Sequence, residues 1–443
     1  MALSTAWNFR CAGARFCRVA ILVPLWLVWA GGVSAQIVVE DVMRADEART
    51  KGIMVPYAFS SETFGAAAGV FAAWWDFPQE QAAVCATAFG SLNGSWRAWV
   101  GAYDLRVPGT QRLFLRPDMM ATSYQNVRTY IDGNPEFSGV RAGSNDSDPN
   151  DFVEDSGWDG RMRLNFSYLL PWAHGREHII NRVRVEQGVR VSEPVGGASW
   201  NPFESGRSYL SAEPFYRRQR IDLDEGKRTL RSNGLKLELR HDNTDFILNP
   251  SFGSRKRVAV TRDFGAFQSS DAWTHWELEY RRFIDLGTSG LHRQRVLALD
   301  AWLSDVPTWQ IETVNGVERV SQRPPYFNGS TLGGFYRMRA FPVNRFSDRS
   351  ALYYSAELRA MPYWNPLEGF TLFGSPEVEW WQWALFAEAG RVADDLDLTE
   401  LHEDMKFDVG AGVRAFSAGL VWRLDMSFAK EDWSFIAMVG HSF

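Results

Sequence analysis

Apolar and polar residues alternate along much of the chain in segments of strand length. Met162, Leu164, Phe166, Tyr168 and Leu170 alternate with the polar residues Arg163, Asn165 and Ser167. The same pattern occupies residues 182–191, 235–240, 275–281 and 420–428. A two-residue period places apolar side chains on one face of a strand and polar side chains on the other. The chain is therefore predicted to be all-β.

Turn residues divide the chain into about sixteen such strands, and bacterial single-chain membrane barrels have an even number. The predicted strands begin near Glu62, Glu80, Ser95, Gln111, Gly160, His178, Gly206, Gly234, Gly253, Ala272, Gly290, Ser350, Val378, Lys406, Ser417 and Trp433. A soluble sandwich would bury the apolar face of each strand, whereas a membrane barrel turns that face to lipid and the charged face to the lumen. Periodicity alone does not separate these two folds, but the density of charge on the polar faces favours the barrel.

The N-terminal residues indicate export from the cytoplasm. Arg10, Arg15 and Arg18 precede a mostly apolar run over residues 19–30, and Val33-Ser34-Ala35 is a small-residue cleavage site. The apolar run is shorter than the roughly 20 residues that a membrane-spanning helix needs. We therefore predict a signal peptide over 1–35, a short N-terminal lead over 36–57 and an outer-membrane β-barrel over 58–443.

Composition agrees with an exported barrel. Aromatic residues make up 14% of the chain, while its net charge is −6 and its mean hydropathy is −0.26. Aromatic girdles at the two membrane interfaces raise the aromatic share without raising hydropathy. No basic block stands out, so a nucleic-acid partner is not expected. Of the three cysteines, only Cys85 would remain after cleavage, so no internal disulfide is expected.

Residues 331–359 interrupt the alternation with a long loop that returns into a strand. The loop contains the pair Gly333-Gly334 and a cationic, aromatic tip, and the strand contains Glu357-Leu358-Arg359. In residues 385–392 Phe386, Glu388 and Gly390 share one face of a predicted strand. The final strand is predicted to run to the last residue, with Phe435, Val439 and Phe443 at its odd positions.

These segments together resemble the bacterial surface antigen family, the BamA/TamA superfamily of outer-membrane barrels. The family's hydrophobic-Arg-Gly-aromatic signature stands here as Met338-Arg339-Ala340-Phe341, on what would be the large sixth extracellular loop. The resemblance implies that this loop folds into the lumen and that Arg339 meets the acidic residue of the 385–392 strand. The implied lock of the loop tip comprises Arg339, Phe341, Glu388, Phe386 and Gly390, and the implied barrel assembly signal comprises Phe443, Val439 and Phe435.

By resemblance, the function would be insertion, assembly or translocation of macromolecules at the bacterial outer membrane. The family's weak seam would here join residues 62–75 to residues 433–443, and the POTRA domains that usually precede such barrels are not expected. Implied partners are outer-membrane lipids, lipopolysaccharide and client proteins. The alternative function is a passive channel for small solutes or ions that the long loop gates.

No enzyme or metal motif accompanies the barrel pattern. A nucleophile elbow, a Walker loop, a His-Glu-x-x-His helix and Cys-x-x-Cys are absent from the sequence. His174 and His178 have helical spacing but lie at a predicted turn. The acidic segment 143–160 starts like a calcium loop, yet Asp151 occupies the glycine position and Gly157 the position of the bidentate glutamate. We therefore expect no catalytic residue, cofactor or metal, and a solvated acidic loop that strand parity places on the periplasmic side.

Overall fold

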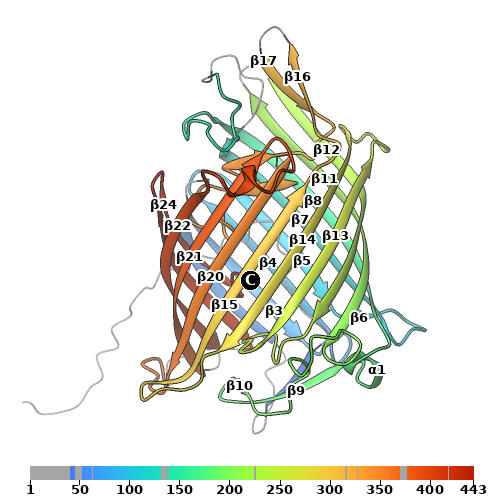
Figure 1. The fold of residues 1–443 in the computed structure, drawn as a ribbon, viewed down its shortest axis with the longest axis vertical. Helices are drawn as coiled ribbons and strands as arrows, with labels where there is room; N and C mark the ends of the chain where they lie inside the picture. The colour runs from blue at the N-terminus through green and yellow to red at the C-terminus, as the bar shows by residue number, and fades with distance from the viewer. Residues whose placement is uncertain are drawn as a thin grey trace, which may run out of the picture.

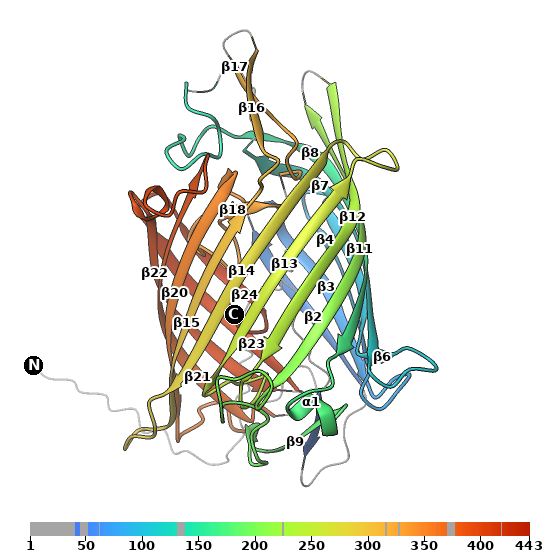
Figure 2. The same cartoon turned by 45° about the vertical axis from the view of Figure 1, so that its right-hand side comes forward.

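The structure is a computed structural model, and its backbone is described for residues 40–44, 52–61, 63–130, 137, 139–223, 226–314, 317–326, 328–369, 377–417 and 419–443. The predicted signal peptide lies outside these residues. Figures 1 and 2 show a tall barrel of tilted strands with loops at one end and a small cap at the other. No helix in the described part of the chain is both long and apolar enough to cross a membrane.

Sixteen strands of the described chain form the barrel sheet, and each pairs antiparallel with the next. They are β2 (Gly52–Ser61), β3 (Gly65–Trp75), β4 (Ala83–Ser91), β5 (Trp96–Tyr103), β7 (Leu113–Thr129), β8 (Val153–Leu169), β11 (Arg207–Leu223), β12 (Gly226–Asp242), β13 (Gly253–Phe264), β14 (Ala272–Asp285), β15 (His292–Asp305), β20 (Ser350–Pro362), β21 (Trp380–Ala393), β22 (Lys406–Ser417), β23 (Leu420–Ala429) and β24 (Trp433–Val439).

Shorter elements occupy the two ends of the barrel. At the end where β2 begins, β1 (Glu40–Arg44), β9 (Asn181–Glu186) and β10 (Val189–Arg190) form a three-stranded sheet beside α1 (His174–Glu177), and β6 (Leu105–Arg106) pairs with β7. The opposite end, here called the loop end, carries the hairpin β16 (Gln310–Val314) and β17 (Val317–Ser321), the pair β18 (Ser330–Leu332) and β19 (Phe346–Asp348), and the 3-10 turn η1 (Glu400–His402).

The strands face apolar side chains outward and charged side chains inward. On β12, Leu237 and Leu239 are 50% and 49% exposed, whereas their neighbours Glu238 and Arg240 are buried. Burial of a charge and exposure of a leucine reverse the arrangement of a soluble protein, so the outer surface must be covered by lipid. The chain is a transmembrane antiparallel β-barrel, as the sequence predicts.

The predicted count of about sixteen strands is confirmed, although one predicted strand lies outside the barrel and one barrel strand was not predicted. The strand predicted near His178 is β9, which belongs to the small capping sheet. The first barrel strand, β2, was missed and begins at Gly52, inside the predicted lead over 36–57. These two errors leave the number of strands unchanged. Between β2 and β9, however, they assign each loop to the wrong end of the barrel. The loop between β7 and β8, which includes the start of the acidic segment 143–160, follows the fifth strand and so lies at the loop end, not at the opposite end.

The first and last strands of the sheet, β2 and β24, meet at a seam. Among the described residues, no ladder of paired residues joins these two strands, in contrast to every other neighbouring pair in the barrel. The strand of residues 65–75, β3, is paired with both β2 and β4, so the strands that border the seam are β2 and β24, and not the strand of residues 62–75 as the sequence suggested. Ile53 and Val55 of β2 belong instead to an apolar cluster with Leu420 and Trp422 of β23.

The reversed polarity predicts that a charge on the outer wall destabilises the barrel. We expect Leu237→Arg to lower the free energy of unfolding by about 2–4 kcal/mol, because the guanidinium would lie in hydrocarbon. Leu92→Arg is the matched control, since Leu92 is 90% exposed in the turn between β4 and β5. Urea unfolding in lipid vesicles measures both variants. Equal stability of the two variants would contradict a lipid-covered wall at Leu237.

Candidate functional site at the luminal loop tip and the seam

The loop between β15 and β20 sends a compact turn, residues 333–345, into the lumen. The pair β18–β19 brings the two ends of this turn together. Inside it, the Gly334 amide donates to the carbonyl of Phe341 at 3.0 Å, and the Phe341 amide donates to that of Met338 at 3.1 Å. Gly333 has φ of 104°, and a Cβ there would lie 2.2 Å from the Pro342 carbonyl oxygen. Glycine at this position is therefore required for the turn to close.

Arg339 lies at the tip of this turn and contacts three carboxylates from three strands. Its Nε lies 3.1 Å from Glu388 Oε1, and its Nη1 lies 3.1 Å from Glu357 Oε2 and 2.8 Å from Asp425 Oδ2. The Arg339 backbone amide also donates to Glu388 Oε2 at 2.7 Å. The guanidinium stacks on the ring of Phe386 at 3.4 Å from its centroid. The four charged side chains are fully buried, so their pairing replaces the water that each charge has lost.

Further arginines extend these contacts into a network, which we call the luminal charge cluster. Arg414 pairs with both Asp425 and Glu357, and Arg359 lies 2.8 Å from Glu357. Arg423 lies 3.6 Å from Asp425. Asp408 accepts the backbone amide of Ala340 at 3.1 Å. The members of the cluster are Arg339, Arg359, Arg414, Arg423, Glu357, Glu388, Asp408 and Asp425.

The other predicted residues of the loop-tip lock lie close by but serve different contacts. Phe341 packs on Phe346, with the two ring centroids 5.2 Å apart, in an apolar cluster with Met338. Gly390 lies beneath the loop, and a Cβ there would come within 2.8 Å of Leu332 Cδ1 and 3.1 Å of Met338 Sδ. Because Gly390 has no side chain, Leu332 and Met338 of the loop can pack directly on β21 at this position.

Sequence reasoning missed most of the carboxylates that face Arg339. From the sequence, Glu357 is identified only as part of the motif Glu357-Leu358-Arg359, and Asp425 and Arg423 only as polar positions of the alternating segment 420–428. Tyr353, whose hydroxyl lies 2.6 Å from Glu388 Oε1, was not noted at all. Their inward parity was readable from the alternation. The height along the barrel at which each side chain meets the loop depends on the cross-strand register. The alternation of apolar and polar residues does not determine that register.

The chain leaves the last strand before its end. β24 ends at Val439, and Gly440, with φ of 97°, turns the tail inward. There Ser442 donates to Glu357 at 3.1 Å, and Phe443 packs in a buried cluster with Phe283. The prediction that the final strand runs to Phe443 is therefore wrong. Of the three residues of the predicted assembly signal, Phe435 and Val439 lie on β24, and Phe443 lies inside the barrel.

The loop tip also contacts both sides of the seam. Phe335 packs against the aromatic cluster that contains Tyr57 and Phe59 of β2. The Phe335 carbonyl accepts a hydrogen bond from Arg423 of β23 at 2.8 Å, and the Arg339 carbonyl accepts one from the Ser434 hydroxyl of β24. The loop tip therefore spans the seam from the inside.

A cavity of about 640 Å³ lies between the loop tip and the seam. Its walls include Phe64, Tyr124 and Phe341, together with the consecutive residues 432–437 of the last hairpin. Consecutive residues of a strand point to opposite faces, so this cavity reaches the edge of β24 and not only its luminal face.

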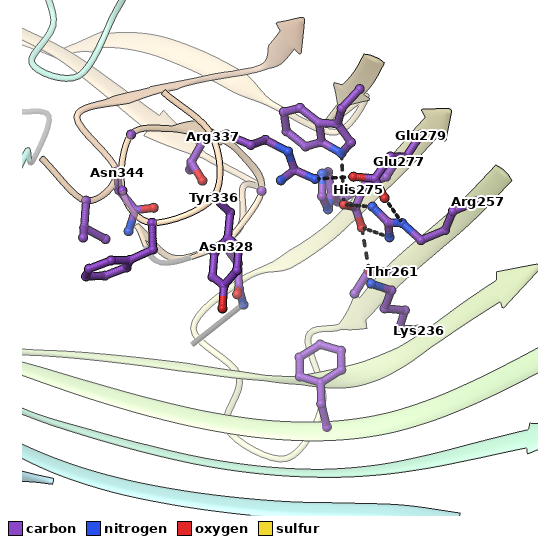
Figure 3. Close-up of a pocket in the computed structure, with 18 of the residues that line it drawn as sticks. Lys236, Arg257, Thr261, His275, Glu277, Glu279, Asn328, Tyr336, Arg337 and Asn344 are labelled. Atoms are coloured by element: carbon purple, nitrogen blue, oxygen red, sulfur yellow. Dashed lines mark hydrogen bonds and ion pairs between the residues drawn. The ribbon is translucent and has the colours of Figure 1, made fainter. Parts of the chain in front are cut away.

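A second cavity, of about 240 Å³, lies on the other side of the tip and is lined by paired charges. Figure 3 shows Arg257 between Glu277 and Glu279, at distances of 2.8 and 2.9 Å. Arg337 of the loop reaches the same Glu279 at 3.0 Å. The loop is therefore held to the far wall of the lumen as well as to the seam wall.

The remaining sequence candidates are His174 and His178 at α1 and the acidic segment 143–160, whose Asp159 is luminal and pairs with Arg217. His174 and His178 stack at 4.5 Å, and burial, followed by the charges of His178 and Arg207, lowers the pKa of His174 to about 4. The acidic segment packs against the long loop, where Arg345 donates to the Ser147 carbonyl at 2.6 Å. Within the described residues, no group of three or more His, Cys, Asp or Glu side chains is placed to hold a metal ion.

No family model and no curated protein matches the chain. Among solved structures, CdiB from Escherichia coli aligns with a TM-score of 0.52 at 10% identity, over 88% of this chain and 62% of that one. CdiB from Acinetobacter baumannii aligns with a TM-score of 0.49 at 10% identity, over 87% of this chain and 58% of that one. BamA from Haemophilus ducreyi lacking POTRA domains 1–3 aligns with a TM-score of 0.47 at 10% identity, over 88% of this chain and 70% of that one. The chain thus spans about three fifths of the two CdiB chains, and it shares a barrel fold with CdiB from Escherichia coli.

The buried ion pairs predict a large loss when one partner is removed. We expect Arg339→Ala and Glu388→Ala each to lower the free energy of unfolding by about 3–5 kcal/mol, because each leaves a buried charge without its partner. Both variants should also expose the loop to protease. Arg319→Ala on the exposed hairpin β16–β17 is the control and should change neither property. Unchanged unfolding and unchanged loop cleavage in both variants would refute the loop-tip lock.

The space above Gly390 allows a second test of loop seating. Gly390→Ala places a methyl group against Leu332 and Met338, so we expect a loss of about 1–3 kcal/mol and faster proteolysis of the loop. Gly90→Ala on β4 is the matched control, because a Cβ there meets nothing within 4 Å. If both alanine variants resist protease like the wild type, the loop does not rest on Gly390.

Proposed function

We propose that this barrel inserts, assembles or translocates client proteins at the bacterial outer membrane, and that the client engages the seam. The observation that carries the proposal is the unpaired meeting of β2 and β24. The predicted export signal and the fold shared with CdiB support the location. We orient the barrel so that the end where β2 begins is periplasmic and the loop end is extracellular.

Three features make the seam the weakest join of the barrel. No ladder of described residues crosses it. β24 has seven residues, whereas a spanning strand needs about 9–11. The side-chain contacts that seal the seam near the periplasmic end come from β23, one strand further on. By contrast, β7, β8, β11 and β12 have 17 residues each and are paired on both sides.

An unpaired strand edge is a template for another strand. It presents backbone amides and carbonyls that a client segment in extended conformation can satisfy. The cavity that reaches the edge of β24 gives such a segment room beside the loop tip. Apolar side chains of the client would face lipid next to Phe435, and polar ones would face the lumen.

The loop tip would control access to this edge. Phe335 packs against the aromatic cluster that includes Tyr57 and Phe59 of β2, and the Arg339 carbonyl accepts a hydrogen bond from Ser434 of β24, so separation of the two strands would disturb at least one of these contacts. The luminal charge cluster fixes the loop in turn. Client engagement at the seam and movement of the loop are thereby coupled.

A passive solute channel remains the second function, and the charged cavity lined by Arg257, Glu277 and Glu279 favours it. In that case the loop would be a constriction and the seam would stay shut. Bilayer conductance and stimulated insertion of a second barrel into liposomes separate the two functions. Large conductance without any stimulation of insertion would support the channel.

A photo-crosslinking amino acid in place of Phe435 tests the site of engagement. Phe435 is 42% exposed on the outer face of β24. We expect crosslinks between this position and an unfolded eight-stranded client barrel presented to the reconstituted protein. The matched control carries the same amino acid at Phe264, which is 61% exposed on β13 in the far wall. Equal crosslinking at both positions, or none at either, would contradict engagement at the seam.

A further inference from the structure

An arginine patch lies on the outer wall of β11 and β12, away from the seam. Arg218 of β11 is directly opposite Arg231 of β12, and Arg220 follows on the same face of β11. Directly opposed residues of an antiparallel pair have Cα atoms about 4.5–5.5 Å apart, and like charges there repel. A barrel that keeps two arginines in this arrangement requires a counter-charge.

Among the residues that the structure describes, no carboxylate pairs with Arg218 or Arg231. Within the described residues, Arg218 makes no hydrogen bond or ion pair, and its Nε is shielded from solvent without a partner. Arg231 donates its Nη1 to Gln268 Oε1, a neutral acceptor, at 2.6 Å. Of these three arginines, Arg220 alone has a carboxylate partner within the described part of the chain, Asp222 at 3.0 Å. The luminal arginines of β11 differ sharply, since Arg217 is paired with Asp159 at 2.6 Å.

The patch lies immediately beyond the lipid-facing belt. The outward positions of β11 change from Leu210 and Tyr216, which are 50% and 39% exposed, to Arg218 and Arg220. On β8, Met162 is the neighbour of Tyr216, and the next outward position, Gly160, is the neighbour of Arg218. The ring of Trp158 lies over Gly160, since a Cβ on that glycine would be 2.2 Å from the indole. An amphipathic tryptophan beside this row is typical of the membrane–water interface.

We propose that Arg218 and Arg231 bind the phosphate of an outer-leaflet lipid headgroup, that of lipopolysaccharide. A phosphate accepts charge-assisted hydrogen bonds from two guanidinium groups and removes their repulsion. Lipid acyl chains beside Leu237 and Tyr216 would hold the headgroup at this height. A free phosphate ion has the charge but not the acyl chains, so the belt favours the lipid. This site rests on the proposed orientation, with the loop end extracellular, but not on the engagement of a client at the seam.

Binding of lipopolysaccharide to the delipidated barrel in detergent tests the proposal. Native mass spectrometry gives the apparent affinity, and the unfolding temperature of the folded barrel on gels gives a second readout. We expect Arg218→Gln/Arg231→Gln to bind lipopolysaccharide at least about tenfold more weakly than wild type, because even one charge-assisted hydrogen bond accounts for that ratio. Arg176→Gln/Arg319→Gln removes the same charge from two exposed sites elsewhere and should bind like wild type.

Two further ligands identify the chemistry that is recognised. Dephosphorylated lipopolysaccharide should bind wild type as weakly as intact lipopolysaccharide binds the Arg218→Gln/Arg231→Gln variant. Inorganic phosphate at matched concentration should leave the wild-type unfolding temperature unchanged. Equal binding of the dephosphorylated lipid would overturn the phosphate contact, and a shift with inorganic phosphate equal to that with the lipid would replace the lipid with a free anion.

The variants are also expected to fold. Without lipid, Arg218→Gln/Arg231→Gln should unfold at the wild-type temperature or slightly above it, since it removes the repulsion between opposed like charges. If the double variant fails to fold, Arg231→Gln alone is tested, because Arg231 is paired with no carboxylate among the described residues. Lipid affinity of this single variant equal to that of wild type then overturns the proposal.

Discussion

The charge of one buried arginine determines how the lumen is arranged. A guanidinium without water is stable only when carboxylates surround it in good geometry. Arg339 meets this requirement with Glu388, Glu357 and Asp425, which come from β21, β20 and β23. No single strand could provide all three, so the loop tip and this part of the wall must fold together. The loop is consequently not a passive filling of the lumen; its position is specified by charge pairing.

The same contacts extend to the seam, which gives the network a role beyond stability. Arg423 reaches the loop at Phe335, the Ser434 hydroxyl of β24 reaches it at Arg339, and the C-terminal tail reaches the cluster through Ser442. Each of these groups belongs to one of the last two strands or to the tail that follows them. Movement of β24 away from its place would therefore break contacts of the loop, the tail and the cluster at once.

Alternation predicted the fold class and most strands, and its failures have physical causes. β2 was missed because Pro56 in its middle argues against a central strand. A proline is tolerated there because β2 borders the seam, where its missing amide removes no ladder bond. β9 was misassigned because its sequence alternates as regularly as a barrel strand, with Val183 and Val185 buried. Alternation reports which face of a strand is buried, not the sheet to which the strand belongs. For the site, a motif identified Arg339 and Glu388, whereas Glu357 and Asp425 required the register of four strands.

The two walls of the barrel differ in what they can bind. The far wall has 17-residue strands that continue past the lipid-facing belt, and that extra length carries Arg218 and Arg231 to the headgroup level. The seam wall ends in a seven-residue strand, so its outer face has no such extension and its edge is instead open to the lumen cavity. A lipid fixed to the far wall would hold the barrel upright in the outer leaflet while the seam side remains free to move. Strand length alone thus separates a surface suited to anchoring from an edge suited to engagement of a client.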